Sequence, residues 1–212
     1  MALPSRAKAA QYRNALPIGV FLFLFQLIIL FGFAFSRVLS ADTVHAFLDV
    51  LTLAGTTFLF GRMWRTEAQF KHYERGWLLV GVWSLGLGGV IIGCEAAVHM
   101  YGSTGVIPPP ALPLLLAALV GAIGNWRMHH ILEAVDDAEH DHLHKNNLDH
   151  VFWDMILSGA VFVSGCSMWI FQTSAIDSII ALLVGFLILP YLAFKRWKEN
   201  GNEHHTCNHS HH

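Results

Sequence analysis

Charge is scarce in this chain, and that scarcity decides its class. Only 13% of its 212 residues are charged, whereas 54% are hydrophobic and the mean hydropathy is +0.48. Apolar runs long enough to cross about 30 Å of hydrocarbon, at 1.5 Å per residue, occur six times. They cover residues 16–36, 41–60, 77–98, 111–131, 150–171 and 176–194. Almost nothing remains for a soluble domain, so we predict an all-α integral membrane protein with six transmembrane helices.

Cysteine is also rare. Cys94 and Cys166 stand inside apolar runs, and Cys207 lies in the C-terminal tail. These positions do not suggest any disulfide pair and exclude a disulfide framework, so we expect all three thiols to be reduced. We expect the first apolar run to be a retained helix, because it is longer than the apolar part of a secretory signal and no small-residue cleavage site follows it.

Positive charge is nearly absent from one side of the predicted membrane. Of the 13 Lys and Arg residues, only Arg37 falls on the side opposite to all the others. The positive-inside rule therefore predicts that both termini are cytoplasmic, which agrees with an even number of crossings. We expect a multi-pass protein of a cell membrane, the inner membrane of a bacterium.

These features divide the chain into three parts. We predict a cytoplasmic N-terminal segment over residues 1–15 and a six-helix transmembrane domain over 16–197. The domain would contain a histidine-rich cytoplasmic loop over 129–145, and a histidine-rich cytoplasmic tail would cover 198–212.

Two His-x-x-x-Asp pairs stand inside the apolar runs. His45 and Asp49 lie in the second run, and His150 and Asp154 open the fifth. An aspartate at the centre of a transmembrane helix costs about 2.5 to 3.5 kcal/mol on insertion, so each pair is a functional candidate. A spacing of four places both side chains of a pair on one helical face, about 5 to 6 Å apart at their Cβ atoms. Each helix therefore offers one nitrogen and one oxygen ligand.

Together the two pairs form a ligand set that suits a metal ion. Two imidazoles and two carboxylates suit tetrahedral zinc, and two ionised aspartates offset its double charge. Counted from Arg37 and Lys145, Asp49 lies roughly 18 Å and Asp154 roughly 13 Å into the membrane, near one level of a core of about 30 Å. The competing interpretation is that each pair is a local His–Asp hydrogen bond packed against other helices or hydrated near a helix end.

Histidine is also concentrated in the loop over 129–145 and in the tail. We expect His140, His142 and His144 of the loop to capture metal loosely and to raise its concentration near the membrane domain. The alternative is a solvated polar loop without a metal role. We interpret the tail as a second metal-gathering segment.

The residues around the two pairs resemble those of the cation diffusion facilitator family of divalent-metal exporters. "SADTVHAFLD" is similar to the family's second-helix pattern, and "NNLDHVFWDMILSGAVFV" is similar to its fifth-helix pattern. The likeness covers residues 16–197. Further similar positions, in the third, fourth and sixth helices, are Tyr73, Arg75, Glu95, Asn125 and Asp177.

The resemblance implies a transport site with a known ligand set and mechanism. Its ligands would be His45, Asp49, His150 and Asp154. It also implies that the second and fifth helices pack together in a homodimer and that protons move in against the metal by alternating access. The family usually ends in a ferredoxin-like cytoplasmic metal-binding domain, whereas only residues 198–212 follow here, so we expect a short form that lacks this domain.

We therefore predict a transporter and not an enzyme: a proton-coupled antiporter that exports a divalent cation, zinc first and cobalt, nickel or cadmium as alternatives. Zinc would be the cargo and not a permanently bound cofactor. The partners would be metal ions, protons, lipid and a second copy of the chain, without nucleic acid. One rival is a membrane redox subunit with His45, His99 and His150 as haem ligands, which leaves both aspartates unexplained. Another is a non-transporting metal-binding subunit of a heteromer, which would use the same ligands.

Overall fold

Helices make up the architecture. The computed structural model describes residues 6–33, 36–61, 67–102, 110–134, 142–173 and 175–206, and no strand occurs within these ranges. The elements are α1 (Arg6–Gly32), α2 (Arg37–Gly61), α3 (Glu67–Gly102), α4 (Ala111–Glu133), α5 (His142–Phe171), α6 (Ala175–Leu183), the π-helical turn η1 (Val184–Ile188) and α7 (Leu189–Thr206).

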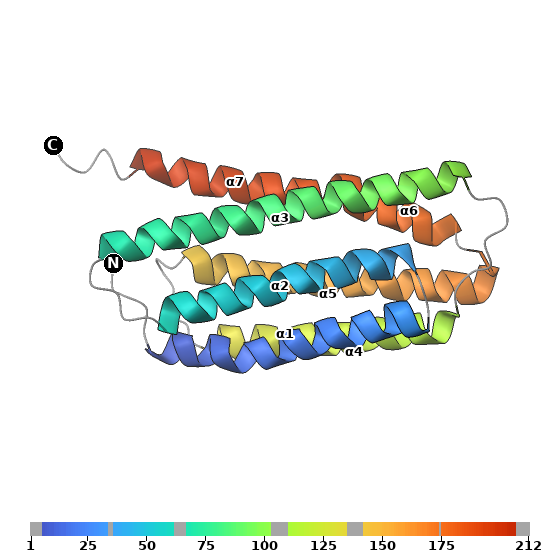
Figure 1. Cartoon of the computed structure of the whole chain (residues 1–212), viewed down its shortest axis with the longest axis horizontal. Helices are drawn as coiled ribbons and strands as arrows, with labels where there is room; N and C mark the ends of the chain where they lie inside the picture. The colour runs from blue at the N-terminus through green and yellow to red at the C-terminus, as the bar shows by residue number, and fades with distance from the viewer. Residues whose placement is uncertain are drawn as a thin grey trace.

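Six helical stretches of the described chain are long and apolar enough to cross a membrane, which confirms the predicted fold class. The sixth is composite, because it runs from Ala175 to Lys195 through α6, η1 and the first part of α7. Successive crossings run in opposite directions, so α1 begins and α7 ends at the same end of the bundle (Figure 1). We call this the terminal end and the opposite one the distal end.

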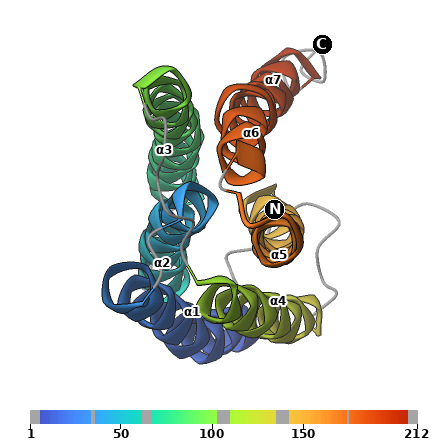
Figure 2. The same cartoon turned by 90° about the vertical axis from the view of Figure 1, so that its right-hand side faces the viewer.

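Two of the helices are central. Seen along the bundle, α1 and α4 lie on one side of α2 and α5, whereas α3 and the α6–α7 helix lie on the other (Figure 2). The contacts between elements agree: α1 packs on α2 and α4, α4 packs on α5, and α3 packs on α2 and on the sixth helix. Polar side chains between α2 and α5 are therefore shielded from lipid on both sides.

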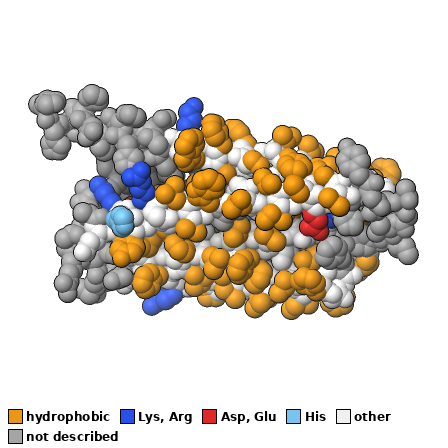
Figure 3. All heavy atoms as spheres, turned by 45° about the horizontal axis from the view of Figure 1, so that its top comes forward, with side chains coloured by type: hydrophobic (Ala, Val, Ile, Leu, Met, Phe, Trp, Pro, Cys, Tyr) orange, Lys and Arg blue, Asp and Glu red, His pale blue; other side chains and the backbone are white. Residues whose placement is uncertain are grey.

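The outside of the bundle is apolar over the middle of its length. Hydrophobic side chains cover the face seen in Figure 3, and Lys and Arg side chains gather toward the terminal end. Phe31, Ile91 and Val98 are each more than 65% exposed. So much exposed apolar surface is costly in water and favourable in hydrocarbon, which supports a multi-pass membrane protein.

A close crossing of backbones joins α3 to the sixth helix. A Cβ atom at Gly185 would lie only 2.5 Å from the backbone nitrogen of Gly93, so glycine is required at this contact. The helix widens here into η1, where the N–H of Leu189 donates to the carbonyl of Val184, five residues earlier. Pro190 follows directly and lacks an N–H for the regular α-helical pattern, which favours such a π-helical turn.

Helices extend further at the terminal end than the apolar runs predict. α1 begins at Arg6, α5 begins at His142 and α7 continues to Thr206. Part of the expected N-terminal segment over 1–15 and part of the expected loop over 129–145 are therefore helical, and the division of the chain into three parts stays a prediction. Helical hydrogen bonds are internal to the backbone, so a helix can continue into polar sequence beyond the hydrocarbon.

Candidate metal centre

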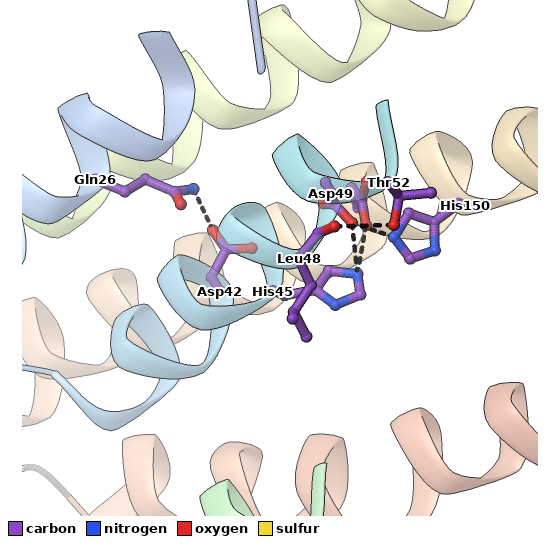
Figure 4. Close-up of polar contacts among 8 residues, drawn as sticks. Gln26, Asp42, His45, Leu48, Asp49, Thr52 and His150 are labelled. Atoms are coloured by element: carbon purple, nitrogen blue, oxygen red, sulfur yellow. Dashed lines mark hydrogen bonds and ion pairs between the residues drawn. The ribbon is translucent and has the colours of Figure 1, made fainter. Parts of the chain in front are cut away.

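The two His-x-x-x-Asp pairs meet between the central helices. α2 carries one pair and α5 the other, and all four residues are between 2% and 7% exposed. One ligand atom from each residue lies within 4.8 Å of the other three. We call these four residues the central site: His45, Asp49, His150 and Asp154. Figure 4 labels the first three of them.

Each histidine of the central site contacts the aspartate of the other helix. His45 Nε2 lies 2.6 Å from Asp154 Oδ1, and His150 Nε2 contacts Asp49 Oδ1. Within α2, by contrast, His45 Nε2 lies 4.0 Å from Asp49 Oδ1. The crossed pairing follows because α2 and α5 are antiparallel, which places the first ligand of one helix level with the second ligand of the other. The pairs are therefore not local hydrogen bonds within single helices.

The two imidazoles of the central site lie against each other. The ring centroids of His45 and His150 are 4.8 Å apart, with 43° between the ring planes. Two axial haem ligands must stand on opposite sides of a porphyrin plane, and this separation leaves no room for one. The geometry therefore argues against a haem held between these two residues. The side chain of His99, the third residue of that rival interpretation, lies outside the described part of the structure.

The His–Asp contacts occupy the atoms that a metal ion would use. A hydrogen bond from an imidazole nitrogen to a carboxylate requires a proton on that nitrogen, and the proton blocks the lone pair that binds metal. Around tetrahedral zinc, with bonds of 2.0 to 2.1 Å, neighbouring ligand atoms are about 3.3 Å apart. The 2.6 Å contact of His45 with Asp154 must therefore open before an ion fits. The central site can therefore be either hydrogen-bonded in this way or metal-bound, but not both at once.

Of the three loop histidines predicted to capture metal, the structure describes the side chain of one. His140 lies outside the described residues, as does the side chain of His142. His144 lies on the buried face of α5, is 4% exposed and has its Nδ1 atom 3.1 Å from Tyr12 Oη. Asn147 Nδ2 donates to the same Tyr12 oxygen at 3.1 Å. His144 therefore lies in a helix with buried polar partners and not in a loop, because α5 begins at His142, and its capture of metal stays a prediction.

A further buried polar pair lies one helical turn from the central site. Gln26 Nε2 in α1 donates to Asp42 Oδ2 in α2 at 2.6 Å (Figure 4). Both side chains are at most 5% exposed. The sequence analysis did not predict this pair, although Gln26 interrupts an otherwise apolar first segment and was a usable signal.

Asp177 has a structural role that the sequence analysis also missed. Its Oδ1 atom accepts hydrogen bonds from Ser36 Oγ and Ser164 Oγ, each at 2.7 Å, and its Oδ2 atom accepts one from the N–H of Arg37 at 2.9 Å. A carboxylate at the N-terminus of α6 therefore caps the N-terminus of α2 and is bonded to α5 as well. It connects the two central helices at the distal end.

A known protein family matches most of the chain. The family described as the cation efflux transmembrane domain matches residues 15–202, which include most of the first crossing, all of the other five and every residue of the central site. No curated protein matches the chain.

Proposed function

Because the chain belongs to the cation efflux family, whose members are transporters and not enzymes, we propose that it exports a divalent metal cation, most simply zinc, in exchange for protons. The observation that carries this proposal is the convergence of the central site, in which four ligand atoms from two helices lie within 4.8 Å of one another. Two imidazole nitrogens and two carboxylate oxygens are a common ligand set for tetrahedral zinc.

Charge balance explains why a membrane protein tolerates this site. A buried aspartate is expensive in hydrocarbon unless another charge compensates it. Asp49 and Asp154 together carry two negative charges, and a divalent cation offsets both. In the absence of metal, protonated His45 and His150, which contact these carboxylates, would provide the compensating positive charges. The site is thus close to neutral in either form.

The same atoms provide the coupling between metal and protons. Metal requires imidazole nitrogens without protons and ionised carboxylates, whereas the hydrogen-bonded form keeps protons on those groups. An acidic solution on the receiving side therefore displaces the ion, and a neutral cytoplasm permits reloading. Alternating access of the central site to the two sides would complete the cycle.

Cobalt, nickel and cadmium are the nearest alternatives to zinc. Imidazole accepts all of these ions, and the presence of two carboxylates does not discriminate among them. Competition between these metals for zinc uptake would identify the preferred cargo. We place both termini in the cytoplasm on the distribution of Lys and Arg, and we retain a homodimer as part of the proposal.

The decisive experiment measures zinc and proton movements through the purified protein. Proteoliposomes with a pH-sensitive dye in the lumen should show proton movement when zinc is added outside. We expect Asp49→Ala and Asp154→Ala each to abolish it, because one ligand and one compensating charge are lost. Intact zinc-driven proton movement in both variants would defeat the assignment of the central site. Absence of flux through the wild-type chain would favour the non-transporting subunit.

A further inference from the structure

Buried polar side chains continue from the central site toward the distal end. Asp42 precedes His45 by three residues in α2, about 4.5 Å nearer that end, and Ser158 follows Asp154 by four residues in α5, about 6 Å nearer it. Gln26 of α1 joins them through its 2.6 Å contact with Asp42. None of Gln26, Asp42 and Ser158, which we call the distal group, is more than 5% exposed.

The distal group contains polar atoms whose hydrogen-bonding capacity is not used. Within the described ranges, Gln26 Oε1 and Ser158 Oγ have no hydrogen-bond partner. Asp154 Oδ2 also has no hydrogen-bond partner there, whereas the Oδ1 atom of the same carboxylate contacts His45 in the central site. Buried polar atoms are almost always paired, and an unpaired set in one region indicates a site for water or an ion.

Gly121 of α4 shows that two of these side chains converge. A Cβ atom on Gly121 would lie 2.7 Å from Ser158 Oγ and 3.4 Å from Gln26 Nε2. Side chains from α1 and α5 therefore approach one spot that the absence of a side chain on α4 leaves open. Asp42 of α2 is joined to this spot through its hydrogen bond with Gln26, so the polar side chains come from α1, α2 and α5.

We propose that Gln26, Asp42 and Ser158 form a second, weaker station for the divalent cation, which receives it from the central site and releases it toward the distal side. This inference rests on the proposed function. The donors are an amide carbonyl, a carboxylate and a hydroxyl, and water would fill the remaining ligand positions. A set of oxygen donors without imidazole holds zinc less firmly than the central site does.

A weak station beside a tight one has a clear use in transport. An ion must bind well enough to be selected and yet leave quickly, and neighbouring sites of decreasing affinity reconcile the two requirements. Asp154 is the central-site ligand of α5 that lies nearer to Ser158, with one oxygen engaged by His45 and the other without a partner in the described chain. It can therefore follow the ion from one station to the other.

The test uses everted membrane vesicles that contain the full-length chain, so that the lumen corresponds to the distal side. Initial zinc uptake is measured against external zinc, and again with increasing zinc already in the lumen. The variants are Ser158→Ala and Asp42→Asn, which remove donors, and Gly121→Ala, which fills the spot beside Ser158 Oγ. The only probe is zinc.

Matched controls are available on α5. Ser167→Ala removes a buried hydroxyl that donates only to the backbone carbonyl of Ser164, at 2.8 Å. Gly159→Ala adds a methyl group that would have no described atom within 4 Å apart from the neighbouring backbone of its own helix. Both controls should export zinc as the wild type does, and immunoblots should show equal amounts of every variant.

We expect the three test variants to keep their KM for external zinc within about twofold while their maximal rate falls about tenfold, because loading is intact and release is slowed. Half-inhibition by lumenal zinc should require about tenfold more zinc, since the station that lumenal zinc occupies is damaged. A purely structural defect would lower the amount of active protein without changing this inhibition constant.

Other results would overturn the inference. The second station would be refuted if Ser158→Ala and Asp42→Asn both kept the wild-type rate of zinc uptake and the wild-type inhibition by lumenal zinc. A raised KM for external zinc with an unchanged maximal rate would also refute it. If Asp49→Ala loses zinc uptake while the three test variants behave as the wild type, the second station is refuted and the proposed function is not. Full uptake in Asp49→Ala would instead defeat the proposed function itself.

Discussion

Substitution of Asp154 by Asn should weaken zinc binding far more than the loss of a surface charge. Asp154 is 2% exposed and contacts His45 at 2.6 Å, so the asparagine keeps its shape but removes one ligand charge from a buried site. With zinc bound, one positive charge would remain uncompensated. Breaking a buried ion pair in this way costs about 3 to 5 kcal/mol. At 1.4 kcal/mol per factor of ten, Kd should rise about 10² to 10⁴-fold.

The assay is equilibrium zinc binding by the full-length protein in competition with a chromophoric chelator. The wild type and Asp154→Asn both contain the histidine-rich segments. The difference in Kd between the tightest zinc-binding event of each protein therefore reports on the central site. Asp149→Asn is the matched control, because it makes the same chemical change on an exposed face of the same helix. Its Kd should stay within about threefold of the wild-type value.

An affinity in Asp154→Asn within about threefold of the wild-type value would refute the reasoning, because a ligand and half of the compensating charge cannot be lost at so small a cost. Equal weakening in Asp149→Asn would also refute it, since general surface charge would then explain the effect.

Two further predictions concern protons and the distal end. Zinc affinity should fall as the pH is lowered from 8 to 6, by up to about tenfold per pH unit for each proton that the ion displaces, and an affinity independent of pH would contradict the proposed exchange. Asp177→Ala should lower the free energy of unfolding by about 1 to 3 kcal/mol, because donors on Ser36, Arg37 and Ser164 lose their acceptor. The measurement is the thermal unfolding midpoint in detergent, where an unchanged midpoint would show that water replaces the carboxylate.

The membrane fold could be read from local properties of the chain. Apolar runs of sufficient length predicted six crossings, and the described part of the chain has six helical stretches that could cross a membrane. The ends of the helices could not be read in this way, because hydropathy reports where hydrocarbon begins and not where helical hydrogen bonds stop. This is why α5 begins at His142 whereas the apolar run begins near 150.

The central site was partly predictable. The His-x-x-x-Asp spacing identified four candidate ligands, and the depth argument placed the two aspartates near one level. The contact of His45 with Asp154 could not be read from either helix alone, since it depends on how α2 and α5 are rotated about their axes. The burial of His144 against Tyr12 has the same origin, because it requires α1 to pack on that part of α5.

By itself, the sequence determined the class of the protein, the number and alternating direction of its crossings, and the residue types available for a metal. These properties depend on composition and on the helical period, which act over a few neighbouring residues. Only the tertiary structure decided which side chains share a site: the crossed His–Asp contacts, the Gln26–Asp42 pair and the cap that Asp177 places on α2. Each joins residues from different helices, and their meeting is set by how whole helical faces pack together.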